Sequence, residues 1–260
     1  MAQATQSIAL TIAGSDSGGG AGVQADLKTF AAFGCFGTSV ITAVTAQNTL
    51  GVHAIHSIPV DIIDAQLQAL ANDLPPAACK TGMLTSAEVI SVVATAIRAN
   101  GWAHYVCDPV MIASSGDVLV DDDALMALRH YLLPLAACVT PNLDEAEALT
   151  GLTVRDPEAM VRAGQALLAL GARAALVKGG HLASDILVDV LVTADRIERF
   201  TRSRVATRAT HGTGCTLSAA ITAQLAREAP IVDAVRKGIE HVQRGIRNAP
   251  HLGAGNGPLG

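Results

Sequence analysis

Residues 7–26 read SIALTIAGSDSGGGAGVQAD, and this stretch indicates the fold class. The stretch begins with a short apolar run, residues 7–13, which predicts a buried strand. A glycine-rich turn follows at residues 18–22, and the chain then opens a helix that carries Asp26. A strand, a glycine loop and a helix in this order make one βα unit, the repeating element of a parallel sheet.

The same pattern recurs along the chain, because short apolar runs alternate with longer segments of helical period. The predicted strands cover residues 7–13, 39–45, 77–80, 104–107, 136–140 and 174–178. Predicted helices include residues 63–70, 86–97 and 217–225, with the last two helices near 212–227 and 231–247. Six parallel strands with helical crossovers predict an α/β fold, a three-layer α/β/α arrangement around a mostly parallel central sheet.

No linker, low-complexity run or internal repeat divides the sequence, so residues 1–260 are predicted to form a single domain. Residues 186–192 predict an added β-ribbon strand. The glycine-rich tail from about residue 253 is expected to be loose.

The composition excludes several classes of partner. The net charge is -5 and no basic cluster occurs, which argues against nucleic acid and anionic membranes as partners and favours a small molecule. The five cysteines are an odd number without a Cys-x-x-Cys pair, so free thiols in a reducing compartment are expected. No apolar run approaches the roughly 20 residues that cross a bilayer, and no signal peptide is recognisable. A soluble cytoplasmic protein is predicted.

Each predicted strand runs into glycine or polar residues. These strand ends are Gly14-Ser15-Asp16, Gln47-Asn48, Lys80-Thr81-Gly82, Asp108-Pro109, Asn142 and Lys178-Gly179-Gly180. In open α/β sheets the ligand crevice lies outside the carboxyl ends of the strands. Polar residues also simply begin loops, but six such ends together favour a binding site at this edge.

The strongest local motif is HGTGCT at residues 211–216, directly before an amphipathic helix. Glycines let backbone N–H groups face an anion, and the helix N-terminus adds about half a positive charge, so the motif predicts a phosphate cradle. Cys215 falls in the first helical turn, where the same field favours a thiolate that could act as nucleophile or base. A capped helix with a buried cysteine is the alternative.

Other motifs are less specific. The 18–22 loop lacks the G-x-G-x-x-G spacing and the chain has no P-loop, which disfavours nicotinamide enzymes and P-loop ATPases. Asn142 and Glu145 have the spacing of a capping box, although Glu145 could instead orient Mg²⁺ waters. Residues 121–123 read as a charged helix start. His53 and His56 lie in a loop-like stretch and are expected to be solvated.

These motifs together resemble the ribokinase-like superfamily, and within it the hydroxymethylpyrimidine/phosphomethylpyrimidine kinases of thiamine biosynthesis. The resemblance rests on AGSDSGGGAGVQADLKT at 13–29, AQNT at 46–49, KTGML at 80–84, DPVM at 108–111, TPNLDE at 140–145, KGGH at 178–181 and HGTGCTLSAA at 211–220. Many ribokinase relatives have Asp as the base at the position that Cys215 holds here.

The resemblance implies a phosphotransferase that uses ATP and Mg²⁺ and acts as a homodimer. It would phosphorylate 4-amino-5-hydroxymethyl-2-methylpyrimidine and then the resulting monophosphate. The implied substrate contacts are Asp26, Gln47, Gly14, Met83 and Val110. The implied catalytic and ATP-binding residues are Cys215, Gly212, Gly214, Lys178, Asn142, Glu145, His211 and Thr213, with Glu145 and Asp108 holding Mg²⁺ through water.

One segment departs from the family pattern. Residues 112–115 read IASS, where relatives often have a flap lysine and where cysteine-dependent pyridoxal kinases of this branch tend to have a second cysteine. This favours the pyrimidine substrate over pyridoxal. A pyridoxal kinase of the same fold and a catalytically silent ligand-binding module stay open as alternatives.

Overall fold

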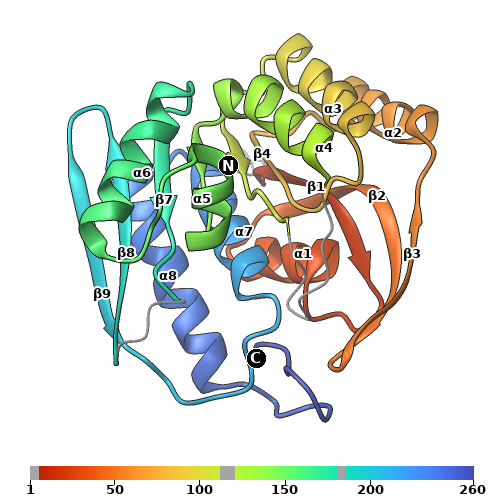
Figure 1. Ribbon diagram of the computed structural model, residues 1–260. Coiled ribbons are helices and arrows are strands. Elements are labelled where there is room, and N and C mark those ends of the chain that lie inside the picture. The colour runs from red at the N-terminus through yellow and green to blue at the C-terminus, as the bar shows by residue number, and fades with distance from the viewer. Residues whose placement is uncertain (1–5, 112–120, 181–184) are drawn as a thin grey trace, which may run out of the picture.

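The computed structural model describes residues 6–111, 121–180 and 185–260. Within these ranges the strands form one sheet in the order β3-β2-β1-β4-β5-β6-β7-β8-β9 (Figure 1). The strands are β1 Ile8–Asp16, β2 Phe36–Asn48, β3 Gly51–Ser57, β4 Ala78–Thr81, β5 Tyr105–Cys107, β6 Cys138–Val139, β7 Ala174–Val177, β8 Ile186–Thr193 and β9 Ile197–Ser203. The helices are α1 Gly22–Ala32, α2 Val60–Asp73, α3 Ala87–Ala99, α4 Asp122–Ala127, α5 Leu143–Thr150, α6 Pro157–Ala169, α7 Thr213–Ala226 and α8 Ile231–Arg247, with short π and 3₁₀ turns at Leu128–Leu132 and Leu133–Leu135.

The six predicted strands are confirmed as the parallel part of the sheet, from β2 through β1, β4, β5 and β6 to β7. The three remaining strands pair antiparallel at its two edges. The chain first builds β2 on one side of β1 and then continues with β4 on the other side. In sheets of this kind, such a reversal leaves a crevice at the carboxyl ends of the strands.

Helices cover both faces of the sheet. Successive side chains of a strand point to opposite faces, so each central strand contributes to the core on both sides. Leu10 and Ile12 join the cluster packed under α2, α3, α5 and α6, whereas Ala9 joins the cluster under α1, α7 and α8. Helix α7 is buried on all sides from Thr216 to Ala226, as expected for a helix between the sheet and an outer helix. The predicted three-layer α/β fold is confirmed.

Two edge strands differ from the predictions. Strand β3 contains His53 and His56, which were expected in a loop; the prediction that they are solvated is confirmed, since both are exposed. Five successive residues of β3 are exposed, so it carries no alternating apolar pattern. Strand β9 alternates between exposed and half-buried residues, carries charged residues on both faces and was not predicted either. Main-chain pairing to β2 and β8 forms both strands.

The expectation of a loose C-terminal tail is wrong. Residues 253–260 fold back over the molecule, where the Asn256 N–H donates to the Thr49 carbonyl at 2.9 Å. The Gly257 carbonyl accepts from the His211 N–H at 3.1 Å. Gly255 lies so close to the chain that an added Cβ would meet the Thr49 oxygen at 1.9 Å. The glycines of the tail therefore permit close packing of backbone on backbone.

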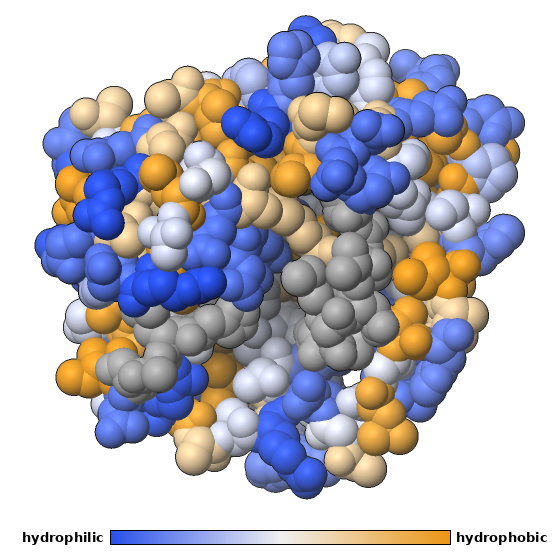
Figure 2. All heavy atoms as spheres, viewed as in Figure 1, coloured by the Kyte–Doolittle hydropathy of each residue, from blue (hydrophilic) through white to orange (hydrophobic). Residues whose placement is uncertain are grey.

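None of the helices in the described ranges is long and apolar enough to cross a membrane. The surface seen in Figure 2 mixes hydrophilic and apolar residues and is hollowed near its centre.

Candidate active site

A cavity of about 560 Å³ lies at the carboxyl ends of the parallel strands. It brings together residues that are far apart in the sequence, as expected for the crevice of an open α/β sheet. Of the predicted site residues, the lining includes Gly14, Gln47, Met83, Asp108, Val110, Asn142, Glu145, Lys178, His211, Gly212, Thr213, Gly214 and Cys215. Asp26 is the one predicted site residue that does not line it.

The loop before α7 is shaped by glycine. Gly212 has φ +80°, and an added Cβ would meet the Gly20 carbonyl oxygen at 1.8 Å, so two glycine loops are in backbone contact. Helix α7 begins at Thr213, and Cys215 lies in its first turn. An added Cβ at Gly214 would lie 3.4 Å from the Lys178 Nζ, which places this ammonium beside the loop. The arrangement offers N–H groups and a cation to a phosphate.

All five cysteines lie in the described ranges and carry free thiols, and Cys215 alone is not buried. Burial nevertheless raises the pKa of the Cys215 thiol to about 11, while the charge on Lys80 opposes this shift. Burial of the sulfur therefore opposes the thiolate that the helix field was expected to favour. The desolvation of the sulfur outweighs the helix N-terminus, so a thiolate at this position needs additional positive charge.

Asp16 ties the first glycine loop to His211. Its carboxylate accepts hydrogen bonds from the N–H groups of Gly18 at 2.8 Å, Gly20 at 3.1 Å and Ala21 at 2.8 Å. The His211 Nε2 lies 2.8 Å from the Asp16 Oδ2. Burial favours a higher pKa for Asp16, but the hydrogen bonds from His211 and the backbone lower it below the usual value. Asp16 thus holds the cavity wall as a carboxylate.

Gln47 stands at the end of β2 and faces the same histidine. Its side-chain carbonyl accepts a hydrogen bond from the Thr45 hydroxyl at 3.1 Å, and its Nε2 lies 3.5 Å from the His211 Nε2. Gly14 makes room for the Met83 side chain, because an added Cβ would meet the Met83 Cε at 2.4 Å. The amide and the thioether therefore line one end of the cavity.

Asp26 is fully buried beneath this end, so the expected direct contact with a substrate is not available in this structure. Its carboxylate accepts a hydrogen bond from the Thr11 hydroxyl at 2.6 Å, and the Lys80 Nζ lies 3.0 Å from both of its oxygens. Both oxygens of this carboxylate thus have partners inside the protein.

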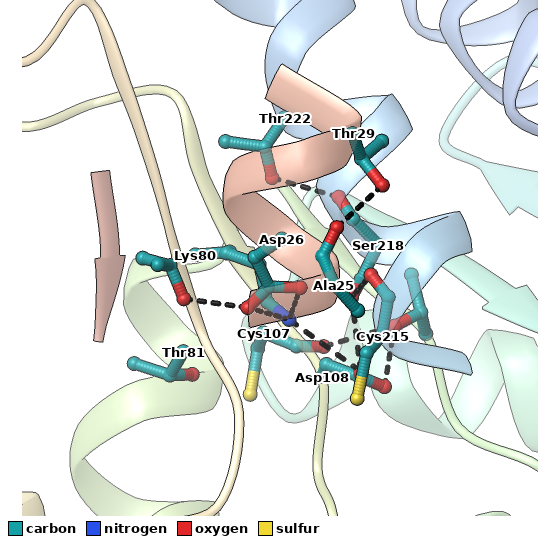
Figure 3. A network of polar contacts seen from close by, with 12 residues as sticks. Ala25, Asp26, Thr29, Lys80, Thr81, Cys107, Asp108, Cys215, Ser218 and Thr222 are labelled. Carbon is teal, nitrogen blue, oxygen red and sulfur yellow. Dashed lines mark hydrogen bonds and ion pairs between the residues drawn. The ribbon is translucent and has the colours of Figure 1, made fainter. Parts of the chain in front are cut away.

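A row of alternating charges continues from this pair to the lining of the cavity, and Figure 3 shows its first members, Asp26, Lys80 and Asp108. The Lys80 Nζ lies 3.9 Å from Asp108, whose other oxygen is 3.4 Å from the Lys178 Nζ. Lys178 in turn lies 3.8 Å from Glu145. Burial would raise the pKa of Asp108, but the two lysines and hydrogen bonds lower it. Burial raises the pKa of Glu145 to about 7, with Lys178 opposing.

The capping box at the start of α5 is confirmed. The Asn142 N–H donates to the Glu145 carboxylate at 2.7 Å, and the Glu145 N–H donates to the Asn142 side-chain oxygen at 2.9 Å. The cap does not exclude a role in binding, because both side chains line the cavity.

The two carboxylates predicted to hold Mg²⁺ differ in their free capacity. Both oxygens of Asp108 are already occupied, by Thr140 and Lys178 on one side and by Ser218 and Lys80 on the other. Glu145 also lines the cavity, and its carboxylate has one lysine, Lys178, beside it and accepts hydrogen bonds from the backbone of Asn142 and Met111. In the described ranges no group of three or more His, Cys, Asp and Glu side chains gathers as a metal site. Since Mg²⁺ is often held by one carboxylate, waters and substrate phosphates, Glu145 fits this ion better than Asp108.

A family model described as phosphomethylpyrimidine kinase matches residues 16–260. The chain belongs to this family. A relative from Rhizobium meliloti (strain 1021), named hydroxymethylpyrimidine/phosphomethylpyrimidine kinase, is 49% identical over 255 residues, which are 97% of this chain and 96% of the relative. The resemblance found in the sequence is thereby confirmed.

Solved structures agree on the fold. The crystal structure of phosphomethylpyrimidine kinase from Clostridium difficile 630 is 43% identical, with a TM-score of 0.82 over 92% of this chain and 98% of that chain. An ADP complex of Bacillus subtilis pyridoxal kinase is 36% identical, with a TM-score of 0.92 over 98% and 97% of the two chains. The ribokinase-like architecture is shared by both kinds of kinase.

Three residues of this site were not given a role by the sequence motifs. Asp16 and Lys80 were noted as strand ends, and Ser218 was seen only within a family motif. The signal for Asp16 is its place between a strand and a glycine loop. For Lys80 the signal is a lysine directly after the short apolar run at residues 77–79. The expected flap at residues 112–115 and His181 of the KGGH motif lie outside the described residues.

Proposed function

We propose that this chain is an ATP-dependent kinase that phosphorylates 4-amino-5-hydroxymethyl-2-methylpyrimidine and then its monophosphate, giving the diphosphate used in thiamine biosynthesis. The observation that carries the proposal is the cavity in which Cys215, the glycine loop of α7 and Lys178 meet. The family and its 49% identical relative supply the reaction class. An ADP complex among the similar structures supports ATP as phosphoryl donor.

The residues suggest one course for the first phosphorylation, in which the acceptor is the hydroxyl of the pyrimidine alcohol. The Cys215 thiolate accepts the proton of the substrate hydroxyl, and the hydroxyl oxygen forms a bond to the terminal phosphorus of ATP. The bond between that phosphorus and its bridging oxygen breaks, and ADP leaves. Backbone N–H groups of Gly212, Gly214 and Cys215 and the Lys178 ammonium would face the charge that develops on the transferred phosphoryl group. The thiol carries this proton after the products leave and passes it to water before the next transfer.

Recognition is divided between the two ends of the cavity. Gln47 offers an amide donor and acceptor to the aminopyrimidine, with Gly14, Met83 and Val110 as walls. A heterocycle that left the amide unpaired would be penalised. Asn142, His211 and Thr213 belong to the end where phosphates bind.

Mg²⁺ would be held through water by Glu145, and when bound it neutralises phosphate charge. We also infer a homodimer in the cytoplasm, which rests on the resemblance to the family.

Pyridoxal is the second candidate substrate, because the Bacillus subtilis pyridoxal kinase superimposes with the higher TM-score, 0.92 against 0.82. Sequence identity favours the pyrimidine, at 43% against 36%. A panel of the pyrimidine alcohol, its monophosphate, pyridoxal and ribose with Mg²⁺-ATP decides between them. ADP release with the first two at micromolar concentration is expected, and a response to pyridoxal alone would overturn the assignment.

Cys215→Ala tests the base. We expect a loss of ~10²–10⁴ in kcat with KM changed little, since general bases contribute about this much. Cys35→Ala is the matched control, because Cys35 is buried outside the cavity and donates to the Ala223 carbonyl. Near-full activity of Cys215→Ala would refute its role as base. If the wild-type protein turns over substrate and the Cys215→Ala protein does not, the alternative of a catalytically silent binding module is excluded.

A further inference from the structure

A buried lysine lies beneath the cavity and is not explained by the fold. Lys80 is in the middle of the sheet, on β4, where it pairs with Thr11 of β1. Its neighbour Ala78 and the matching Ala9 of β1 point to the same face and belong to the apolar cluster under α1, α7 and α8. The Lys80 side chain has an exposed fraction of 0%. A charge in such a layer is costly unless it is paired.

The pairing does not by itself account for the residue. Asp26 on α1 supplies the partner at 3.0 Å, but a buried ion pair can often be replaced by apolar residues without loss of stability. The Lys80 ammonium also reaches toward the cavity floor. An added Cβ at Gly82, which lines the cavity, would lie 3.7 Å from the Lys80 Nζ.

The same ammonium is connected to the first turns of α7. It lies 3.9 Å from the Asp108 Oδ2, the oxygen that accepts a hydrogen bond from the Ser218 hydroxyl at 2.9 Å. Ser218 also lies 3.0 Å from the backbone carbonyl of Cys215 (Figure 3). Asp108 is thereby fixed between Lys80 and Lys178, under the thiol-bearing turn of α7.

We propose that Lys80 is a positioning residue for the reaction: held by Asp26, it fixes Asp108 from below and supplies the buried positive charge that offsets a thiolate at Cys215. The inference deepens the proposed function, and its electrostatic part can be measured without turnover. The charged groups around the thiol are Lys80 on β4, Asp26 on α1, Asp108 after β5 and Lys178 after β7.

The direction of the charge effects agrees with this role. Burial raises the pKa of the Cys215 thiol, and the charge on Lys80 is the strongest influence that lowers it, whereas Asp26 raises it. Burial would lower the pKa of Lys80, but Asp26, Cys215 and Asp108 raise it well above its usual value. Lys80 therefore keeps its charge.

The test measures the alkylation rate of Cys215 by iodoacetamide between pH 8 and pH 10, where the rate follows the thiolate fraction. The other four cysteines are buried, and Cys215→Ala provides the blank. The main comparison is Asp26→Asn against Asp26→Asn with Lys80→Met, because neither variant leaves Asp26 as an unpaired buried carboxylate. Lys237→Met, on the exposed surface of α8, is the matched control and should alkylate like the wild type.

Asp26→Asn is expected to alkylate faster than the wild-type protein, because a negative charge is lost near the sulfur. Adding Lys80→Met is expected to slow alkylation about tenfold relative to Asp26→Asn, which corresponds to a shift of one pKa unit. A purely structural role for Lys80 would instead loosen the site, so that the double variant would alkylate faster than Asp26→Asn. A double variant that alkylates as fast as Asp26→Asn, or faster, would overturn the proposal.

Kinase assays of the same variants separate this inference from the proposed function. Lys80→Met should lower kcat more than it raises KM, and the acidic limb of the pH profile of kcat should move to higher pH. If none of the four substrates turns over but the alkylation rates differ as expected, the proposed function fails and the charge effect stands. If the wild type turns over and the alkylation rates do not differ, the Lys80 proposal alone fails.

Discussion

At the scale of single residues, Glu145 combines two roles that oppose each other energetically. Its carboxylate closes the capping box of α5, and its burial beside the cavity disfavours the charged form. The cap needs only an oxygen acceptor, whereas a role at the phosphates needs the negative charge. The site therefore keeps a carboxylate that costs stability in the unliganded protein.

Glu145→Gln should show this cost. The pKa of Glu145 is about 7 in the folded protein, against an ordinary value of 4.5, so the folded state binds the extra proton between these values. The contribution of Glu145 to stability therefore falls as pH rises through this window, by about 3 kcal/mol in total. The glutamine side chain would keep the cap without the charge, so the variant should be the more stable protein at pH 8 and differ little near pH 4.5.

The measurement is urea unfolding of both proteins at the two pH values. Glu88→Gln is a suitable control, because Glu88 occupies the first turn of α3 and is exposed, so a change of about a few tenths of a kcal/mol is expected there. A Glu145→Gln protein that is less stable than wild type at pH 8 would contradict the burial argument.

At the scale of elements, the C-terminal tail joins parts of the site that the sheet alone does not connect. It bonds to Thr49 in the turn after β2 and to the backbone of His211 before α7. Its Pro258 also lies close to the first glycine loop, 3.1 Å from where a Cβ of Gly20 would lie. Gln47 is two residues from Thr49. The tail therefore holds the end of β2, which carries Gln47, next to the loop that carries His211.

Gly255→Ala should disturb this contact, because the new methyl group would meet the Thr49 oxygen at 1.9 Å. We expect a loss of about 1–3 kcal/mol of stability, typical of overpacking, and a raised KM for the pyrimidine alcohol. Thermal unfolding and steady-state kinetics measure the two effects. Asn256→Ala is the control, since it removes an exposed side chain and keeps the backbone bond to Thr49. A Gly255→Ala protein with unchanged KM would show that the tail does not position Gln47.

At the scale of the whole molecule, one sheet carries both core clusters, so the two helical layers depend on the same strands. Neighbouring residues of β1 belong to opposite clusters, which means that neither layer can lose its packing without exposing the strand that supports the other. Such a molecule is expected to unfold as one cooperative unit.

This expectation can be checked with two probes. Trp102 is the only tryptophan and is buried in the cluster under α2 and α3, so its fluorescence reports on one layer. Far-UV circular dichroism reports on helices of both layers. The two unfolding curves in urea should have the same midpoint, as a single domain over residues 1–260 requires. Separate midpoints would mean that the chain unfolds in two parts.

The sequence by itself determined the parallel core of the sheet, the helices on both sides and the family. Apolar runs of strand length alternate with helical periods because both faces of the central strands must be buried. The sequence also placed most of the cavity residues, since strand ends in this fold meet at one edge. It did not predict the edge strands β3 and β9, most of whose residues are exposed and whose formation depends on a neighbouring strand.

Only the tertiary structure decided where the charges act. Asp26 was expected to bind a substrate, but α1 turns it toward Lys80 of β4, 54 residues away along the chain. The helix N-terminus suggested a thiolate at Cys215, but burial of the sulfur has the larger effect. The local sequence pattern indicates which residues lie near a strand end or a helix start. The ion pairs that these residues form and the desolvation of their side chains depend on which other parts of the chain pack around them.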